Sequence, residues 1–501
     1  MVGDSWANGS YAGERPCLTQ ADSSGSLSTG SPTRVPQAWG GFVTTIERHS
    51  IDGFSGEVMC SGDAGYDEAR AVFNAMFDRR PAAIACCTST KDVVAAVRYA
   101  TSSGLPLTVY GGGHGVTGSA VADGGLCIDL RGLKEVSVDP DTRTVRAGGG
   151  LTWGELDAAT QEHGLAVTGG RVSSTGVGGL ALGSGSGWLE RSFGFTCDNL
   201  LAAEVVTAAG EVVTASATQN PELFWALRGG GGNFGVVTTF TLGLHTLGPI
   251  VYGGMLMYPA QQGAQVVRAW RDVMLDAPDA LGTGLAFLTA PPEDFVPEPV
   301  RGHPVIGVVI CWTGPVDDGP AALAPLLEAA PPAIAMVQPM PYVALQQLLD
   351  NANPHGMRNY WSGDFFGELP DEAVDALVNL ATKPVSPLTQ VILVRGGGAV
   401  ARVDENATAF SDRTAQFNIH YLGMWPDAAQ DDANIAAIRT LSTAMKPWTT
   451  GMVYLNFLGE EGQGRIAAGF GEEKYARLRE LKKTWDPTNV FRHNQNIPPA
   501  S

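Results

Sequence analysis

The amino-acid sequence predicts an α+β fold with two domains. Its 501 residues exceed the size at which a single hydrophobic core usually stops growing. Strand and helix patterns alternate up to about residue 248, whereas residues 249–450 are richer in apolar strands. With 44% hydrophobic residues, 17% charged residues and 64 glycines, the chain has the composition of a globular protein with many loops.

The elements of the first half follow from apolar spacing and from local start and stop signals. Helical periodicity predicts helices at residues 66–77, 90–102 and 152–163. Thr90 and Thr152 are the expected N-caps of the last two, Thr152 within a T-x-x-E capping box, and Gly104 is an expected stop. Apolar and β-branched runs predict strands at residues 83–87, 105–110, 126–130, 135–138, 144–147 and 203–207.

The second half predicts one antiparallel sheet covered by helices on one side. Apolar runs predict strands at residues 251–257, 283–288, 304–312, 389–394 and 416–424, and helices at 262–275, 321–327 and 370–381. His420 and Tyr421 are neighbours on one of these strands, so at most one of them can line a cavity.

Glycine-rich segments recur along the chain. YGGGHG at 110–115 follows an apolar strand, residues 172–187 contain six glycines, and residues 223–240 carry four consecutive glycines after a short helix. Such segments let a backbone approach a diphosphate and offer it bare N–H donors. A fourth segment, residues 485–499, carries His493 among several asparagines.

Together these segments resemble the vanillyl-alcohol-oxidase-type flavoproteins and, within them, the berberine-bridge-enzyme-like oxidases, over roughly residues 67–499. The resemblance implies a PCMH-type FAD-binding domain of two subdomains and a substrate domain with an antiparallel sheet covered by helices. We therefore expect four parts. They are a flexible N-terminal extension at 1–38, an FAD-binding domain at 39–248, a substrate-binding domain at 249–450, and a C-terminal segment at 451–501 that returns to the FAD-binding domain.

The resemblance also implies which residues hold the cofactor. His114 is expected to carry FAD covalently, and to be the only link, because Val172 stands where many relatives have a second cysteine attachment. Cys197 is expected to be a packed apolar thiol. The other cofactor-binding residues implied are Gly111, Gly112, Gly113, Gly115, Ser174, Thr175, Gly176, Gly178, Gly179, Asn199, Gly235, Val237, Asn494 and Asn496.

For catalysis, the resemblance implies two residues. Tyr454, with Asn456 in a Tyr-x-Asn pair on a strand at residues 452–457, is the candidate base that takes the substrate O–H proton, and the alternative is a packing role at the seam between domains. Thr175 would stand over the flavin, where its small side chain admits O2. Arg395 is expected either to bind an anionic substrate group or to end a strand.

The expected reaction is oxidation of an alcohol or activated C–H carbon of a small molecule, such as a bacterial secondary metabolite. FAD would accept the hydride, and O2 would be the electron acceptor with release of H2O2. The alternatives are a carbohydrate oxidase, a flavin-dependent monooxygenase, or a flavin-binding scaffold without catalysis.

Charge and composition bear on partners and location. The net charge of −19 argues against nucleic acid and anionic membranes as partners. The sequence has no apolar run of 18 residues and no recognisable signal peptide, so we expect a cytoplasmic bacterial protein. The eight histidines are scattered, so no metal site is expected. The seven cysteines, without a C-x-x-C pair, are expected to be free thiols. The oligomeric state is left open.

Overall fold

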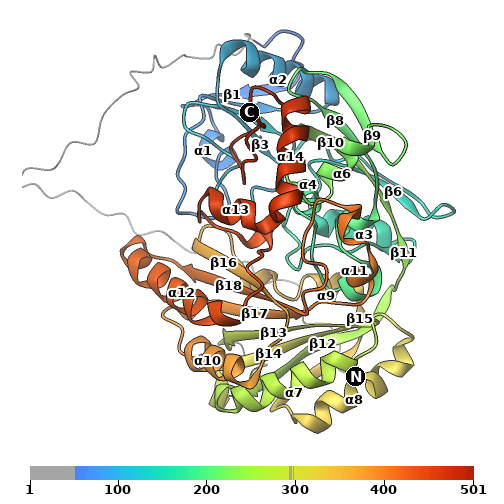
Figure 1. Ribbon diagram of the computed structural model, residues 1–501, viewed down its shortest axis with the longest axis vertical. Helices are drawn as coiled ribbons and strands as arrows, with labels where there is room; N and C mark the ends of the chain where they lie inside the picture. The colour runs from blue at the N-terminus through green and yellow to red at the C-terminus, as the bar shows by residue number, and fades with distance from the viewer. Residues whose placement is uncertain (1–50, 293–295, 297) are drawn as a thin grey trace, which may run out of the picture. The chain divides into compact units, whose positions relative to one another are not determined.

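The computed structural model describes residues 51–292, 296 and 298–501, which belong to one compact unit. The expected extension at 1–38 lies outside the described residues. Three large sheets organise the chain, with four, five and seven strands. Figure 1 shows the seven-stranded sheet with α7, α8 and α10 on one side and the glycine-rich part of the chain on the other.

The first sheet has the strand order β1-β2-β4-β3, with β2 and β3 parallel to β4 and β1 antiparallel to β2. Its strands are β1 (Glu57–Met59), β2 (Ala83–Cys86), β3 (Leu107–Tyr110) and β4 (Leu126–Asp129). Helix α2 (Thr90–Ser103) packs on this sheet through a buried face of valine and alanine. Ser89 is its N-cap and accepts a hydrogen bond from the Asp92 N–H, so the cap lies one residue before the predicted Thr90. Gly104 ends the helix in the left-handed conformation, as predicted.

The second sheet is antiparallel, with the order β5-β6-β10-β8-β9. Its strands are β5 (Val136–Asp139), β6 (Thr144–Gly148), β8 (Leu200–Val206), β9 (Val212–Ser216) and β10 (Val236–Gly243). The helices around it are α3 (Trp153–Gln161), α4 (Val177–Leu182), α6 (Pro221–Leu227), α13 (Gln463–Phe470) and α14 (Glu472–Trp485). Helix α3 begins with the predicted capping box of Thr152 and Glu155. The last 40 residues share a hydrophobic core with this sheet, through Phe470, Leu478 and Ile497.

The third sheet is antiparallel throughout, with the order β15-β12-β14-β13-β17-β18-β16. Its strands are β12 (Ile250–Pro259), β13 (Leu281–Thr289), β14 (Pro304–Trp312), β15 (Ile334–Pro341), β16 (Arg358–Phe366), β17 (Gln390–Arg395) and β18 (Phe417–Trp425). Helices α7 (Gly263–Asp276), α8 (Gly319–Ala329), α10 (Asp371–Ala381) and α12 (Asp431–Met445) join its hydrophobic core. The predicted antiparallel sheet with a helical cover is therefore confirmed.

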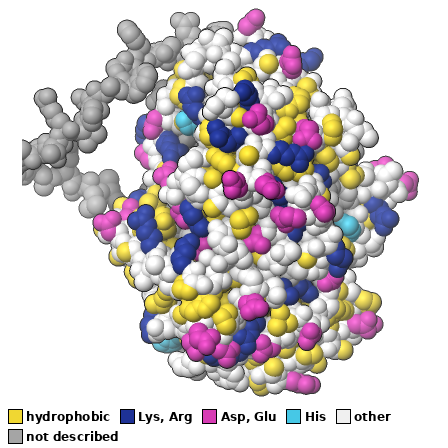
Figure 2. All heavy atoms as spheres, in the orientation of Figure 1, with side chains coloured by type: hydrophobic (Ala, Val, Ile, Leu, Met, Phe, Trp, Pro, Cys, Tyr) yellow, Lys and Arg dark blue, Asp and Glu magenta, His cyan; other side chains and the backbone are white. Residues whose placement is uncertain are grey.

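Shorter elements connect these layers. They are α5 (Glu190–Phe193), α9 (Tyr342–Gln346), α11 (Ala399–Arg402), β7 (Leu165–Ala166) and β11 (His245–Thr246). Among the described residues, no helix combines the length and the apolar character needed to cross a membrane. On the face drawn in Figure 2, lysine and arginine side chains are interspersed with aspartate and glutamate. Cys86, Cys87, Cys127, Cys197 and Cys311 are free thiols, and Cys197 is completely buried, as predicted.

Two expected elements are wrong. The predicted helix at 66–77 stops after one turn, as α1 (Tyr66–Ala69). Beyond it, the Asn74 side chain donates to the carbonyls of Val116 (2.6 Å) and Asn359 (2.8 Å), so the chain leaves the helical path to join the third sheet. The predicted strand at 452–457 is instead an extended stretch followed by a 3-10 turn, Leu455–Phe457.

Candidate active site

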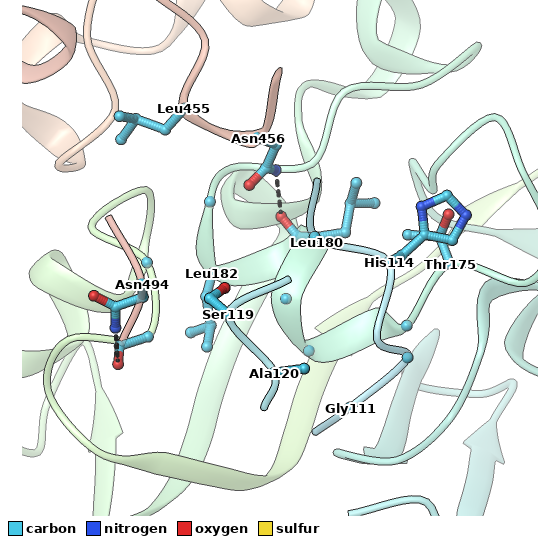
Figure 3. Close-up of a pocket in the computed structure, with 18 of the residues that line it drawn as sticks. Gly111, His114, Ser119, Ala120, Thr175, Leu180, Leu182, Leu455, Asn456 and Asn494 are labelled. Carbon is cyan, nitrogen blue, oxygen red and sulfur yellow. Dashed lines mark hydrogen bonds between the residues drawn. The ribbon is translucent and has the colours of Figure 1, made fainter. Parts of the chain in front are cut away.

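A cavity of ≈ 330 Å³ lies between the glycine-rich loops and one face of the seven-stranded sheet. Its walls come from four stretches that are far apart in sequence, at residues 107–120, 170–186, 230–240 and 491–495, together with residues of the third sheet and of the 454–457 turn. Figure 3 shows His114 and Thr175 at one end of this cavity and Asn494 at the other. All four glycine-rich or asparagine-rich segments of the sequence therefore meet at this cavity.

Close backbone approach explains why two of the glycine positions cannot carry side chains. A Cβ on Gly112 would lie 2.3 Å from the backbone nitrogen of Gly176, and a Cβ on Gly176 would lie 2.4 Å from that of Gly112. The two loops thus touch backbone to backbone, which only glycine permits. A Cβ on Gly183 would likewise lie 1.9 Å from Oδ1 of Asn456. The wall that results is bare main chain with its amide groups near the cavity.

His114 is held by aromatic contacts at the cavity wall. Its ring stacks on Phe73, with centroids 4.0 Å apart, and meets the ring of His355 edge-on at 5.7 Å. Its Nε2 atom is buried and has no hydrogen-bond partner. Burial, and then the nearby charge of His355, lowers the pKa of His114 to about 3. The imidazole is therefore neutral at physiological pH, with a nitrogen lone pair available for a bond.

Most of the predicted cofactor-binding residues line this one cavity. They are Gly111, Gly112, Gly113, His114, Gly115, Thr175, Gly176, Gly178, Gly179, Gly235, Val237 and Asn494. Ser174, Asn199 and Asn496 are not among the lining residues. The Asn199 amide donates to the carbonyls of Phe193 and Phe195, both at 2.9 Å, and therefore holds the turn before β8. Val172, the residue at the expected second attachment position, does line the cavity.

Tyr454 is a buried residue that lines the cavity. Its hydroxyl oxygen accepts hydrogen bonds from the Ser186 N–H (2.8 Å) and from the Asn456 amide (3.3 Å). Burial raises the pKa of Tyr454 above its ordinary value of 10, and these hydrogen bonds oppose that rise. The Asn456 amide also donates to the Leu180 carbonyl at 3.2 Å, an interaction visible in Figure 3. Tyr454 is therefore a neutral phenol at physiological pH, with two donors fixed on its oxygen.

An ion pair that the sequence reasoning missed borders the same cavity. Arg171 lies 3.4 Å from the Glu190 carboxylate and donates to the Ser186 hydroxyl at 3.1 Å. The Ser186 hydroxyl in turn donates to Glu190, so the pair is joined through Ser186 to Tyr454. In the sequence, Arg171 follows two glycines and stands directly before Val172, where the glycine-rich segment begins. This position could have indicated that Arg171 lies near the cofactor site. Among the described residues, it is the only lysine or arginine lining the cavity.

The neighbours His420 and Tyr421 face opposite sides of β18, as predicted. His420 lines the cavity, whereas Tyr421 is packed in the core between the sheet and its helices. Arg395 lies at the end of β17 and donates to the backbone carbonyls of Gly396 and Gln416. It is not a lining residue of the cavity. Sequence reasoning also missed the lining residue Trp361, and His355 beside His114, because both lie in segments without a recognisable motif.

The lining residues fit FAD. The glycine loops present main-chain amides, which suit a diphosphate, and Arg171, the one lysine or arginine among the described lining residues, is already paired with Glu190. Buried polar atoms that lack a partner border the same space, namely Nε2 of His114, Nε2 of His493 and Oδ1 of Asn494. Such atoms are complementary to the polar edge of a heteroaromatic ring. In the described part of the chain, no group of three or more His, Cys, Asp or Glu residues is arranged to hold a metal ion.

Comparison with known proteins agrees with this site. Residues 81–216 match the FAD binding domain family, and residues 453–498 match the family described as berberine and berberine like. These two matched stretches carry His114 and Tyr454 respectively.

Relatives match over nearly their whole length. An FAD-linked oxidoreductase from Dictyostelium discoideum is 30% identical over 463 residues, which cover 91% of this chain and 98% of that protein. The (R)-6-hydroxynicotine oxidase of Paenarthrobacter nicotinovorans is 31% identical over 456 residues, covering 89% and 97%. The crystal structure of 6-hydroxy-D-nicotine oxidase from Arthrobacter nicotinovorans superposes with a TM-score of 0.80 at 29% identity, covering 89% of this chain and 98% of that one. The chain thus belongs to the berberine-bridge-enzyme-like family of FAD-linked oxidoreductases.

Proposed function

We propose that the protein is an FAD-dependent oxidase that removes a hydride from an alcohol or activated C–H carbon of a small molecule and uses O2 as the electron acceptor. Overall, the substrate loses two electrons and two protons, and O2 gains them to form H2O2. We further propose a role in secondary metabolism. The supporting observation is that His114 and the glycine loops share one cavity with Tyr454 and His420.

When bound, FAD supplies the acceptor for the hydride and the donor of electrons to O2. The glycine loops would bind the diphosphate of FAD, and Asn494 would contact the polar edge of its flavin ring. The neutral imidazole of His114, with its unpartnered nitrogen, supports covalent attachment there. Val172 cannot form such a bond, so we propose His114 as the sole link.

In this proposal, Tyr454 takes the proton that leaves the substrate hydroxyl. The donors from Ser186 and Asn456 stabilise negative charge on the phenol oxygen, which a base at this position requires. Burial works against the charged form, so the base would become effective only as the pH rises. Thr175 lines the same cavity and is the proposed neighbour of the O2 path.

Anaerobic titration of the purified holoprotein with candidate alcohols tests the proposal. A substrate should bleach the flavin absorption band, and admission of air should then restore the band with one H2O2 released per substrate oxidised. A monooxygenase would instead place an atom from labelled O2 in the product. A binding scaffold would retain FAD without bleaching by any compound in the panel, and that result would contradict the proposed oxidation.

A further inference from the structure

We infer that the substrate is an aromatic small molecule that carries a hydroxyl group, and that His420 holds this hydroxyl on an otherwise apolar wall. The inference rests on the proposed function, because it concerns the substrate of the same cavity.

The wall is one face of the seven-stranded sheet. In the strand register, His420 stands opposite Ile392 of β17, and Leu422 stands opposite Trp361 of β16, so their side chains share a face. The sheet residues that line the cavity are Trp361, Ile392, Val394, His420 and Leu422. The Trp361 indole N–H already donates to Oδ1 of Asn359 at 3.1 Å. His420 is therefore the one polar side chain that this described wall has available for a ligand.

Packing fixes the His420 ring and leaves one of its nitrogens unused. The ring stacks on Phe457, with centroids 3.8 Å apart and planes 4° apart, and meets Trp361 edge-on at 4.9 Å. Gly363 stands opposite His420 on β16. A Cβ at this position would lie 3.2 Å from Cβ of Phe457, so the glycine leaves room for the Phe457 side chain. His420 is 5% exposed, and its Nε2 atom has no hydrogen-bond partner. Buried polar atoms are normally paired, so the missing partner indicates a ligand.

The partner that suits His420 is an uncharged hydroxyl. Burial, and then the charge of Arg171, lowers the pKa of His420 to about 3, so the ring is a neutral imidazole. Its Nε2 atom donates in one tautomer and accepts in the other, and a hydroxyl group satisfies both. A carboxylate would be disfavoured, because the neutral imidazole offers it no opposite charge and Arg171, the one lysine or arginine among the described lining residues, is already paired with Glu190.

The rest of the wall favours an aromatic ring over a sugar. An oligosaccharide brings many hydroxyl groups, and each one loses free energy on burial unless it finds a partner. On the described sheet wall, His420 is the one side chain available to hydrogen-bond a hydroxyl group, and its neighbours are aliphatic and aromatic. Aromatic rings pack favourably against Trp361 and Phe457, both of which border the cavity.

Ligand pairs that differ by one hydroxyl test the inference on the holoprotein. 4-Methoxyphenol and 4-methylanisole would be titrated anaerobically, with xylobiose as the sugar probe, and binding would be followed by perturbation of the flavin absorption spectrum. We expect the phenol to bind about tenfold more tightly than its methyl analogue, and xylobiose to give no perturbation at the same concentration. Binding of xylobiose in preference to the phenol, or binding of no aromatic probe, would overturn the inference.

The same experiment separates this inference from the proposed reaction. Benzyl alcohol and 4-hydroxybenzyl alcohol would be added to detect bleaching. If the aromatic probes bind with the expected preference but no alcohol bleaches the flavin, the substrate-class inference stands and the proposed oxidation fails.

A matched pair of variants tests the residue. His420→Phe keeps the stack on Phe457 but removes Nε2, so the tenfold preference for the phenol should fall to within about twofold. Tyr421→Phe, at the adjacent residue on the opposite face, should leave the preference intact. If His420→Phe does not retain FAD, His420→Leu takes its place. A preference that survives either His420 replacement would contradict the assignment.

Discussion

His114 combines a neutral imidazole, a stacked position on Phe73 and an unpartnered Nε2, which is the state a covalent flavin link requires. We predict that FAD stays with the denatured polypeptide and maps to the peptide that contains His114. His114→Ala should release all flavin into the acid supernatant. His163→Ala, at an exposed site beyond α3, should retain the link. Flavin found on another residue would contradict the single attachment.

Tyr454 has two donors on its oxygen but is fully buried, so its acid–base behaviour is the sharpest test of its role. We predict that flavin reduction accelerates toward high pH, because burial raises the pKa of Tyr454 above 10. Tyr454→Phe should abolish this increase of the reduction rate with pH and slow flavin reduction by about 10²–10⁴-fold. Tyr258→Phe, another buried phenol in the core of the third sheet, serves as the control. Rapid reduction by the Tyr454 variant would leave this residue as a packing group.

Thr175 belongs to the oxidative half-reaction in our proposal. Thr175→Ile adds bulk in the cavity, so reoxidation of the reduced flavin by O2 should slow while reduction by substrate changes little. Thr175→Val removes the hydroxyl at nearly constant volume and distinguishes size from polarity. Stopped-flow absorbance resolves the two half-reactions. Equal reoxidation rates for Thr175→Ile and the parent would remove Thr175 from the oxygen path.

At the scale of elements, the glycine loops of the proposed cofactor site touch backbone to backbone, so we expect them to tolerate no added side chain. Gly112→Ala would place a Cβ 2.3 Å from the backbone nitrogen of Gly176, so one loop has to move. We predict lower FAD content and a lower melting temperature. Gly464→Ala, in the exposed part of α13 with open space around its Cβ, should be neutral or stabilising by up to about 1 kcal/mol. Full FAD occupancy in Gly112→Ala would mean that the loops tolerate separation.

The elements also show where sequence reasoning succeeds and fails. Strand β14 occupies the predicted residues 304–312, because its apolar run is buried on both faces. Strand β15, at the sheet edge, was not predicted, since its two prolines and its lack of buried residues hide the strand pattern. The glycine loops could be predicted as local signatures. Trp361 and His355 could not be predicted, because only long-range strand pairing and packing bring Trp361 to the cavity and His355 to His114.

At the scale of the whole molecule, a buried carboxyl joins the glycine-rich part of the chain to the third sheet. Asp157 of α3 accepts a hydrogen bond from Gln346 of α9 at 3.0 Å, and burial raises its pKa from 3.8 to about 7. In the unfolded chain this carboxyl ionises near pH 4. Between about pH 4 and pH 7 the unfolded chain therefore binds fewer protons than the folded one, and stability falls as the pH rises through this window.

Asp157→Asn removes this titration while keeping an acceptor for Gln346. We predict that the variant gains stability relative to the parent as the pH rises, by up to about 4 kcal/mol above pH 7. Melting temperatures at pH 5 and pH 8 measure the effect, and the difference between variant and parent should be larger at pH 8. A pH-independent difference would mean that Asp157 is ionised in the folded protein.

The C-terminal segment has a consequence for the order in which the protein is made. Asn233 donates to the carbonyl of Gln495 and accepts from the N–H of Ile497, so the last residues are tied to a loop synthesised some 260 residues earlier. Phe491, His493, Asn494 and Gln495 line the cavity whose opposite end is formed by His114. During synthesis, the glycine loops emerge from the ribosome long before the residues that complete their site. In our proposal, cofactor capture is therefore a late event, and a ribosome that stalls before residue 491 releases a chain whose cavity is incomplete.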